Sequence, residues 1–520
     1  MKMKKQTAGL SLLIATLLYL AAGCERVDHY ATDPSLRLDF STDTLTFDTL
    51  FTTIGSTTKQ FMVYNPHGEN LRIESVSLAS GGRSGFRLNV DGRKGDSFSG
   101  IDLWKRDSLR VLVEVTASAN NADRPLLIQD SILFYTNGVR QFVLLQAVGQ
   151  DVHIIRGGRT YTENTTLPAD RPYLIFDSLT VGPGVTLTLA PGATLCFHHQ
   201  AKLIVAGTLK AIGTQAQPIT LRGDRLDSIY ANVTLPYDRV PGQWGGIRFE
   251  STSFENELEY ADIRNTSFGL DFQPSTPDRR KIRIHNSRVT NSSGDLLTAV
   301  NCHIEASGSE FTNAAGNTVC LIGGRHRFAH CTLANFIVLT TRQGAPTLIL
   351  TDTVRIDNTP HHYPLTEARF DNCLIDGSIS GDTTRTYRGE ISLISRNGDT
   401  AGSDAFNYRF TACYILTKAI TNNPRFDRCL FGFSQKPIYL KSGTRKQAYA
   451  YDFRLANKSV GIGAADRTIA AEFPTDRYGV SRLAGSTAPT IGAYEHAHQP
   501  EEKKPSTTPL KGRLALRKAG

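Results

Sequence analysis

The sequence predicts an all-β protein in which an N-terminal β-sandwich is followed by a right-handed parallel β-helix. Short runs of alternating apolar and polar residues, such as 110–115 and 185–189, are separated by Gly, Pro, Asn and Asp. Long stretches of helical periodicity are absent. From residue 261 onward, a small residue, an apolar residue and an Asn recur in register, two positions apart, in steps of 26, 22 and 22 residues.

The first 23 residues resemble a secretory signal. Lys2, Lys4 and Lys5 precede an apolar run at 10–20, which is too short to span a bilayer permanently, and small residues lead into Cys24. This arrangement predicts a lipoprotein that is cut after Gly23 and held on a membrane by a lipid on Cys24. The alternative is an ordinary cleaved signal with an incidental cysteine.

Residues 24–35 are polar and are expected to form a tether. Residues 36–151 then contain seven short strand patterns joined by turns, which is typical of a β-sandwich. The patterns lie at 36–40, 44–47, 60–64, 71–73, 109–115, 131–135 and 142–145. The region resembles immunoglobulin-like modules of exported Bacteroidetes proteins. The resemblance rests on Phe47, Gly55-Ser56 and Val63-Tyr-Asn65 at the opening, and on Ile132, Gly138, Leu144 and Gly149 at the close.

Residues 152–497 are predicted to form the β-helix. One turn of such a helix takes about as many residues as the repeat, so equivalent residues should stack at about 4.8 Å. The repeat units are Ala261/Ile263/Asn265, Ser287/Val289/Asn291, Ser309/Phe311/Asn313 and Cys331/Leu333/Asn335, continued by Cys373/Ile375, Cys413/Ile415 and Cys429/Phe431. We expect an apolar column, an Asn ladder that bonds from turn to turn, and insertions at 343–367 and 377–406. The four cysteines share a position with Ala and Ser and are therefore expected to be buried thiols rather than disulfides or metal ligands.

Residues 150–496 resemble the right-handed parallel β-helix lipoproteins of Bacteroidetes, within the pectate-lyase-like class. The matching motifs are Gly207-Thr-Leu-Lys-Ala-Ile-Gly-Thr214 with Pro218-Ile-Thr-Leu221, Gly242-Gln-Trp-Gly-Gly-Ile247, Phe370-Asp-Asn-Cys-Leu-Ile375, and Arg482 with Ile491-Gly-Ala-Tyr-Glu495. The resemblance implies an outer-membrane lipoprotein on the cell surface or on the periplasmic face. It specifies architecture rather than activity.

Residues 498–520 are polar and basic, and they are expected to be a disordered tail. The tail from 501 carries +4 and the signal carries +3, which leaves +2 of the net charge of +9 for everything else. Because the body is nearly neutral, we expect no nucleic-acid partner.

Candidate ligand-binding residues are Arg325, His326 and Arg327, beside the Gly323-Gly324 turn, together with Asp376. The two arginines could bind the carboxylates of uronates, and the alternative is an exposed turn between coils. Asp371, Asp376 and Asp382 could bind calcium, although Asp is also common at corners. Weaker candidates are His198-His199, His361-His362 and Trp244, each of which also suits a corner or an exposed loop. No cofactor, metal or set of catalytic residues is assigned.

The sequence favours a membrane-anchored envelope lipoprotein whose β-helix binds glycans or other macromolecules without catalysis. The alternative is a polysaccharide lyase or glycoside hydrolase that acts in a groove of the β-helix, and an envelope-organising role remains a third reading. Carboxylates or basic residues that converge from neighbouring coils within about 5–9 Å would favour an enzyme.

Overall fold

The computed structural model describes residues 29–230, 234–379, 389–396, 405–432, 436–447, 449–484 and 488–500. The predicted signal, Cys24, Asp382 and the tail from 501 lie outside the described residues. The chain divides into two compact units, Met1–Asp151 and Val152–Gly520. Within the described residues, no helix is long and apolar enough to cross a membrane.

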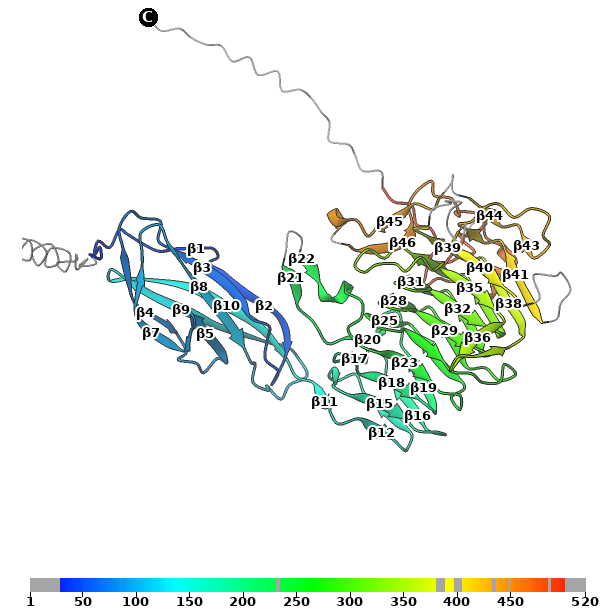
Figure 1. Cartoon of the computed structure of the whole chain (residues 1–520), viewed down its shortest axis with the longest axis horizontal. Coiled ribbons are helices and arrows are strands. Elements are labelled where there is room, and N and C mark those ends of the chain that lie inside the picture. Colours follow the sequence, from blue (N-terminus) through cyan, green and yellow to red (C-terminus); the bar gives the residue numbers. More distant parts are fainter. Residues whose placement is uncertain are drawn as a thin grey trace, which may run out of the picture. The chain divides into compact units, whose positions relative to one another are not determined.

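The first unit is a sandwich of two five-stranded sheets (Figure 1). One sheet has the order β1(Asp39–Phe40), β3(Lys59–Tyr64), β8(Ser108–Val115), β5(Phe86–Val90) and β6(Arg93–Gly95). The other has the order β2(Thr44–Phe51), β10(Val139–Gln150), β9(Leu126–Thr136), β4(Leu71–Leu78) and β7(Ser97–Leu103). All pairings are antiparallel except β2 with β10. Inward apolar residues of both sheets form one core, as in Val63 and Ile132.

Each of the seven predicted sandwich strands overlaps an observed one. Strands β5, β6 and β7 were missed. The run from Phe86 to Val90 alternates buried and less buried residues, so its period of two was present in the sequence.

The second unit is a parallel β-helix built from three long sheets, which the chain visits in turn (Figure 1). The first sheet contains β11(His153–Ile155), β14(Tyr173–Ile175), β17(Thr194–Phe197), β20(Ile219–Gly223), β25(Ala261–Arg264), β28(Arg288–Ser292), β31(Glu310–Ala314), β34(Thr332–Asn335), β39(Leu374–Gly377), β42(Tyr414–Ile415) and β44(Leu430–Phe431). The second sheet contains β12(Arg159–Tyr161), β15(Ser178–Val181), β18(Lys202–Val205), β23(Gly246–Phe249), β26(Leu270–Phe272), β29(Leu297–Val300), β32(Val319–Ile322), β35(Leu348–Thr351) and β40(Ile391–Ile394). The third sheet contains β13(Thr165–Leu167), β16(Thr186–Leu189), β19(Thr208–Ile212), β24(Asn256–Glu259), β27(Ile282–His285), β30(His303–Ser307), β33(Gly324–Ala329), β38(Leu365–Asp371), β41(Phe406–Thr411) and β43(Phe426–Asp427). The predicted fold class is therefore confirmed.

The predicted apolar column is present. Ile263, Val289, Phe311 and Leu333 are partners in direct register on successive strands of the first sheet, and all four are fully buried. The column continues through Ile375, Ile415 and Phe431. One inward side chain per coil, repeated at the strand spacing, fills the interior of the cylinder.

A second column runs through the small residues at the corner between the third and first sheets. The backbone N–H of Ser287 donates to Ser309 Oγ at 3.0 Å, and the N–H of Cys373 donates to Cys413 Sγ at 3.3 Å. Each hydroxyl or thiol also donates to a carbonyl two residues earlier, as Ser309 does to Ser307 at 2.8 Å. All seven described cysteines are free, and those at 331, 373 and 413 are buried, so the buried-thiol prediction is confirmed for these three.

The repeated Asn residues behave differently from the predicted ladder. The strand bends at Asn265, which follows β25 with a φ of 67°. Asn335 Nδ2 reaches the neighbouring coil, but it donates to the carbonyl of Ala314 at 2.8 Å rather than to another amide. Asn265, Asn291 and Asn313 adopt the left-handed conformation, which suits Asn, and the side chains of Asn265, Asn313 and Asn335 bond to backbone groups.

The two predicted insertions are partly regular coil. Strands β35 and β40 lie within them and belong to the second sheet. Among the described residues, the added chain includes the hairpin of β36(Thr353–Ile356) and β37(Thr359–His362). Further additions are the hairpins β21(Ser228–Tyr230) with β22(Thr234–Pro236) and β45(Tyr439–Ser442) with β46(Tyr451–Leu455), and the short helices η1(Tyr237–Arg239), η2(Arg445–Gln447) and α2(Arg467–Glu472).

After the last coil the chain returns along the outer face of the first sheet. Tyr439 and Phe453 pack there, and Arg477 forms an ion pair with Asp262 at 2.7 Å. Tyr494 donates a hydrogen bond to Glu310. This C-terminal segment covers one sheet of the cylinder, and α2 reaches the edge of the third sheet.

Candidate functional site

The outer face of the third sheet carries a column of charged side chains in direct register. Its first four members alternate in sign: Lys210, Glu257, Arg283 and Glu305. Its next three members are all arginines, Arg327, Arg369 and Arg409, which are partners on β33, β38 and β41. We call these three the arginine row. Like charges directly opposite on neighbouring strands destabilise a sheet, so the row requires anionic partners.

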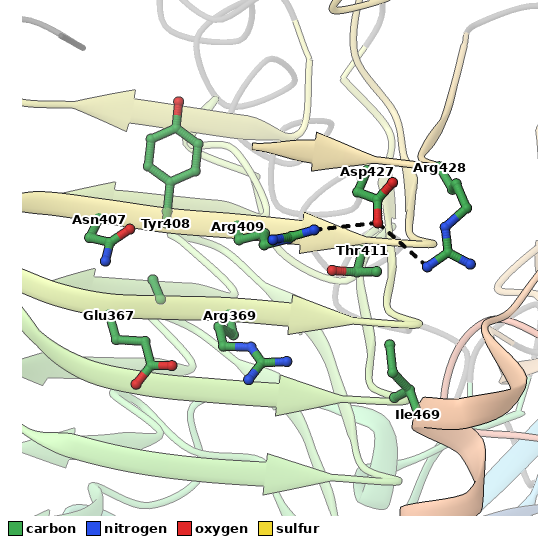
Figure 2. Close-up of a pocket in the computed structure, with 10 residues that line it drawn as sticks. Glu367, Arg369, Asn407, Tyr408, Arg409, Thr411, Asp427, Arg428 and Ile469 are labelled. Atoms are coloured by element: carbon green, nitrogen blue, oxygen red, sulfur yellow. Dashed lines mark hydrogen bonds and ion pairs between the residues drawn. The ribbon is translucent and has the colours of Figure 1, made fainter. Parts of the chain in front are cut away.

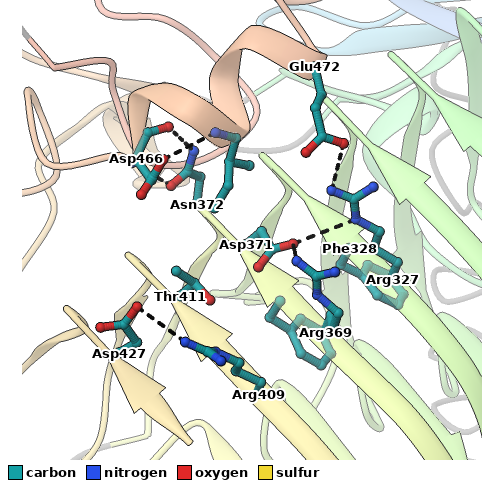
Figure 3. Close-up of polar contacts among 12 residues, drawn as sticks. Arg327, Phe328, Arg369, Asp371, Asn372, Arg409, Thr411, Asp427, Asp466 and Glu472 are labelled. Atoms are coloured by element: carbon teal, nitrogen blue, oxygen red, sulfur yellow. Dashed lines mark hydrogen bonds and ion pairs between the residues drawn. The ribbon is translucent and has the colours of Figure 1, made fainter. Parts of the chain in front are cut away.

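Carboxylates on the same face supply part of the negative charge that the arginine row requires (Figure 3). Asp371 lies 3.1 Å from Arg369 Nη2 and 3.6 Å from Arg327 Nε. Its side chain is fully buried, and among the described residues its Oδ1 has no hydrogen-bond partner. Glu472, from α2, accepts a hydrogen bond from Arg327 Nη2 at 2.8 Å.

The row ends at a pocket of about 480 Å³ that lies over β38, β41 and β43 (Figure 2). Asp427 lines this pocket and forms ion pairs with Arg409 at 3.5 Å and with Arg428 at 3.4 Å. The pocket is lined by Glu367, Ala368, Arg369, Asn407, Tyr408, Arg409, Thr411, Asp427, Arg428 and Ile469. Its volume suits a small ligand or one or two units of a polymer, and its side chains are mostly hydrogen-bonding groups.

The arginines keep their charge in this setting. Burial lowers the pKa of Arg327, but the contacts with Glu472 and Asp371 outweigh it, and the net shift is upward. The hydrogen bond to Asp466 raises the pKa of Arg428. The side chains of the row are 33%, 42% and 57% exposed in sequence order, so they can exchange a carboxylate of the protein for one of a ligand.

Local sequence explains the row. The pattern Arg-Phe-x-x-Cys occurs at 327–331, 369–373, 409–413 and 425–429. Successive residues of a strand face opposite sides, so each Arg points outward and each Phe points inward. Phe328, Phe370, Phe410 and Phe426 stack with ring centroids 5.1, 4.9 and 5.0 Å apart. The cysteine enters the small-residue column at the corner.

The four residues predicted to bind a ligand do not form one cluster. Arg325 and Arg327 face outward from strand β33 rather than from a turn, and Arg325 pairs with Glu367 at 2.9 Å. His326 faces the core, its Nε2 lies 2.7 Å from the Gly323 carbonyl, and burial lowers its pKa to about 4. Asp376 lies on the first sheet, where Tyr439 donates to it at 2.6 Å and burial raises its pKa to about 6.

The other candidate ligand-binding residues also lie apart from one another. Asp371 and Asp376 face outward from different sheets, and the described residues contain no group of three or more metal-ligating side chains. Trp244 is fully buried, stacks on Phe197 at 4.2 Å and donates to the Arg264 carbonyl, so it is a core residue. His198 pairs with Asp224 at 2.6 Å, and His361 and His362 lie on β37.

Sequence reasoning identified Arg327 and missed the other residues of the row and the pocket, Arg369, Arg409, Asp427 and Arg428. The signal that could have found them was the fourfold Arg-Phe-x-x-Cys pattern. This pattern overlaps the small-residue repeat, because Cys331, Cys373, Cys413 and Cys429 each end one Arg-Phe-x-x-Cys motif.

No protein-family model matches the chain. A segment of 99 residues is 36% identical to "Protein bark beetle" of Drosophila melanogaster, and it spans 19% of this chain and 3% of that protein. Among solved structures, pectate lyase Pel9A aligns over 67% of this chain and 88% of its own, with 13% identity and a TM-score of 0.26. A PapD-like domain of human CEP192 aligns over 25% of this chain and 95% of its own, with 12% identity and a TM-score of 0.16.

Proposed function

We propose that this protein is a membrane-anchored envelope lipoprotein whose β-helix binds acidic glycans at the arginine row and its pocket. The observation that carries this proposal is the change from alternating charges to three arginines in register. Neighbouring guanidinium groups on a parallel sheet repeat at about 4.8 Å. A linear polymer with carboxylate or sulfate groups at short, regular intervals would place one anion against each arginine.

On binding, anions of the ligand would replace the protein carboxylates that pair with the arginines. Asp427 and Glu472 hold arginines through partly exposed ion pairs, which contribute about 0–1 kcal/mol each. A carboxylate or sulfate of the ligand can accept charge-assisted hydrogen bonds from the same guanidinium groups. Asn407 and Thr411 then supply hydrogen-bonding groups for sugar hydroxyls within the same pocket.

Acid–base catalysis is less well supported than binding. Basic residues from neighbouring coils do converge, as an enzyme would require, but an arginine stays protonated and cannot accept a proton. The two carboxylates that line the pocket, Glu367 and Asp427, are both paired with arginines. A lyase or hydrolase is therefore the alternative that product analysis tests.

The direct experiment measures binding of oligogalacturonate and of a sulfated heparin oligosaccharide to the purified protein. We expect Arg409→Gln to weaken binding about tenfold and Arg409→Lys to weaken it less, because lysine keeps the charge but loses the planar pair of donors. Arg283→Gln, on the same sheet but outside the pocket, serves as the matched control. Equal affinity of Arg409→Gln and wild type, or no binding of either probe, would contradict the proposal. New unsaturated or reducing ends would indicate an enzyme.

The anchoring proposal rests on the sequence around Cys24. We expect cells to incorporate labelled palmitate into the wild type and not into Cys24→Ala. Protease treatment of whole cells then distinguishes display at the cell surface, where the protein is cut, from the periplasmic face, where it is protected.

A further inference from the structure

Helix α2 carries one carboxylate at each end, Asp466 and Glu472 (Figure 3). Asp466, at its N-terminus, pairs with Arg428 at 2.6 Å, and Glu472, at its C-terminus, pairs with Arg327 at 2.8 Å. Between them, Ile469 contributes to the pocket wall. One short helix thus contacts arginines on both sides of the candidate binding site.

The start of the helix is fixed to the cylinder. The Asn372 side chain donates to the Asp466 carbonyl at 2.9 Å and accepts from the Asp466 N–H at 2.7 Å. Asp466 in turn caps the helix by accepting from the N–H groups of Thr468 and Ile469. Because Asp466 is engaged through backbone and side chain, a ligand cannot displace it without unwinding the helix.

The end of the helix is held more weakly. Glu472 is 50% exposed and meets Arg327 through side-chain atoms alone. Such an ion pair is screened by salt and costs little to exchange. Arg327 nevertheless remains next to Arg369 in the row, where like charges favour an anion at this point whether Glu472 or a ligand supplies it.

We infer that Glu472 is an intrachain competitor, which occupies Arg327 in the free protein and is displaced when an acidic glycan binds along the arginine row. The inference rests on the proposed function and adds a mechanism of regulation to the same site. The Glu472 side chain thus acts as a releasable latch on Arg327, while Asp466 holds the start of α2 on the cylinder.

The test compares Glu472→Gln with wild type in binding of oligogalacturonate at low salt. Removal of the competing carboxylate should raise the affinity about two- to fivefold, the equivalent of one partly exposed ion pair. Glu257→Gln is the matched control, because it removes one carboxylate from the third sheet, three strands from Arg327, and should leave the affinity unchanged. In wild type, hydrogen exchange at residues 468–472 should rise when the probe is added.

The outcomes separate the two proposals. Tighter binding by Glu472→Gln than by wild type, with the affinity of Glu257→Gln unchanged, supports the latch. Equal or weaker binding by Glu472→Gln overturns the latch and leaves glycan binding in place. Failure of both proteins to bind overturns the proposed function and, with it, the latch.

Discussion

The pocket depends on the directions of three side chains within one repeat. In β38, Arg369 faces solvent, Phe370 enters the core, and Asp371 returns to the outer face beside Arg369. The same alternation holds for Arg327 and Arg409. A shift of one residue in register would exchange the arginine and phenylalanine columns, burying guanidinium groups and exposing rings, so the core fixes where the charges appear.

Asp376 shows how burial changes a single carboxyl. Burial raises its pKa from 3.8 to about 6, despite the hydrogen bond from Tyr439 that favours the charged form. A raised pKa means that the folded state prefers the protonated acid. The stability from this group is therefore complete below pH 4 and is lost as the pH rises through about 6.

We predict that Asp376→Asn removes this pH dependence. Relative to the variant, wild type should lose up to about 3 kcal/mol of unfolding free energy between pH 4 and pH 7. Urea unfolding of both proteins across that range provides the measurement. Parallel curves for the two proteins would contradict the buried, pKa-shifted position of Asp376.

At the scale of elements, neighbouring coils are joined by the small-residue column as well as by strand pairing. Ser309 accepts the Ser287 N–H from the preceding coil and donates to the Ser307 carbonyl. Cysteines take over the position from residue 331 and make the same contacts through longer sulfur bonds. One side chain thus satisfies two backbone groups at a corner where the strand ladder is interrupted.

We predict that Ser309→Ala destabilises the protein by about 1–3 kcal/mol, because the buried Ser287 N–H loses its acceptor. Ser309→Cys should cost less, since sulfur occupies this position in later coils. Denaturant midpoints measure both changes, with the exposed substitution Arg283→Gln as the control. A loss as large for the Cys variant as for the Ala variant would contradict the bonding role.

At the scale of the whole molecule, the chain forms two units with separate cores. The sandwich core draws on residues from 38 to 147, and the β-helix core draws on residues from 155 to 415. Each core is closed by its own sheets, and the strand pairings given above stay within one unit. We therefore expect each unit to unfold with its own free energy of unfolding.

We predict that a fragment of residues 152–500 folds without the sandwich. Its circular dichroism should show β-structure, and its melting temperature should match the β-helix transition of the full chain within a few degrees. The fragment of residues 29–151 is the companion measurement. An unfolded or aggregated 152–500 fragment would show that the β-helix needs the sandwich to form.

Much of the β-helix follows from local sequence. The stack from Ile263 to Leu333 was predicted residue by residue. This was achievable because each coil repeats the same pattern at a similar length. The coils after Asn335 were harder to predict, since their strands follow one another at unequal intervals along the chain.

The sequence by itself determined the fold class, the inward column and the burial of the thiols at 331, 373 and 413, because a period of two and a repeat of one coil are local properties. Only the tertiary structure decided that Asp376 lies under Tyr439 and that Glu472 reaches Arg327. Those contacts join segments whose separation in the chain carries no periodic signal, and they depend on where the returning C-terminal segment packs.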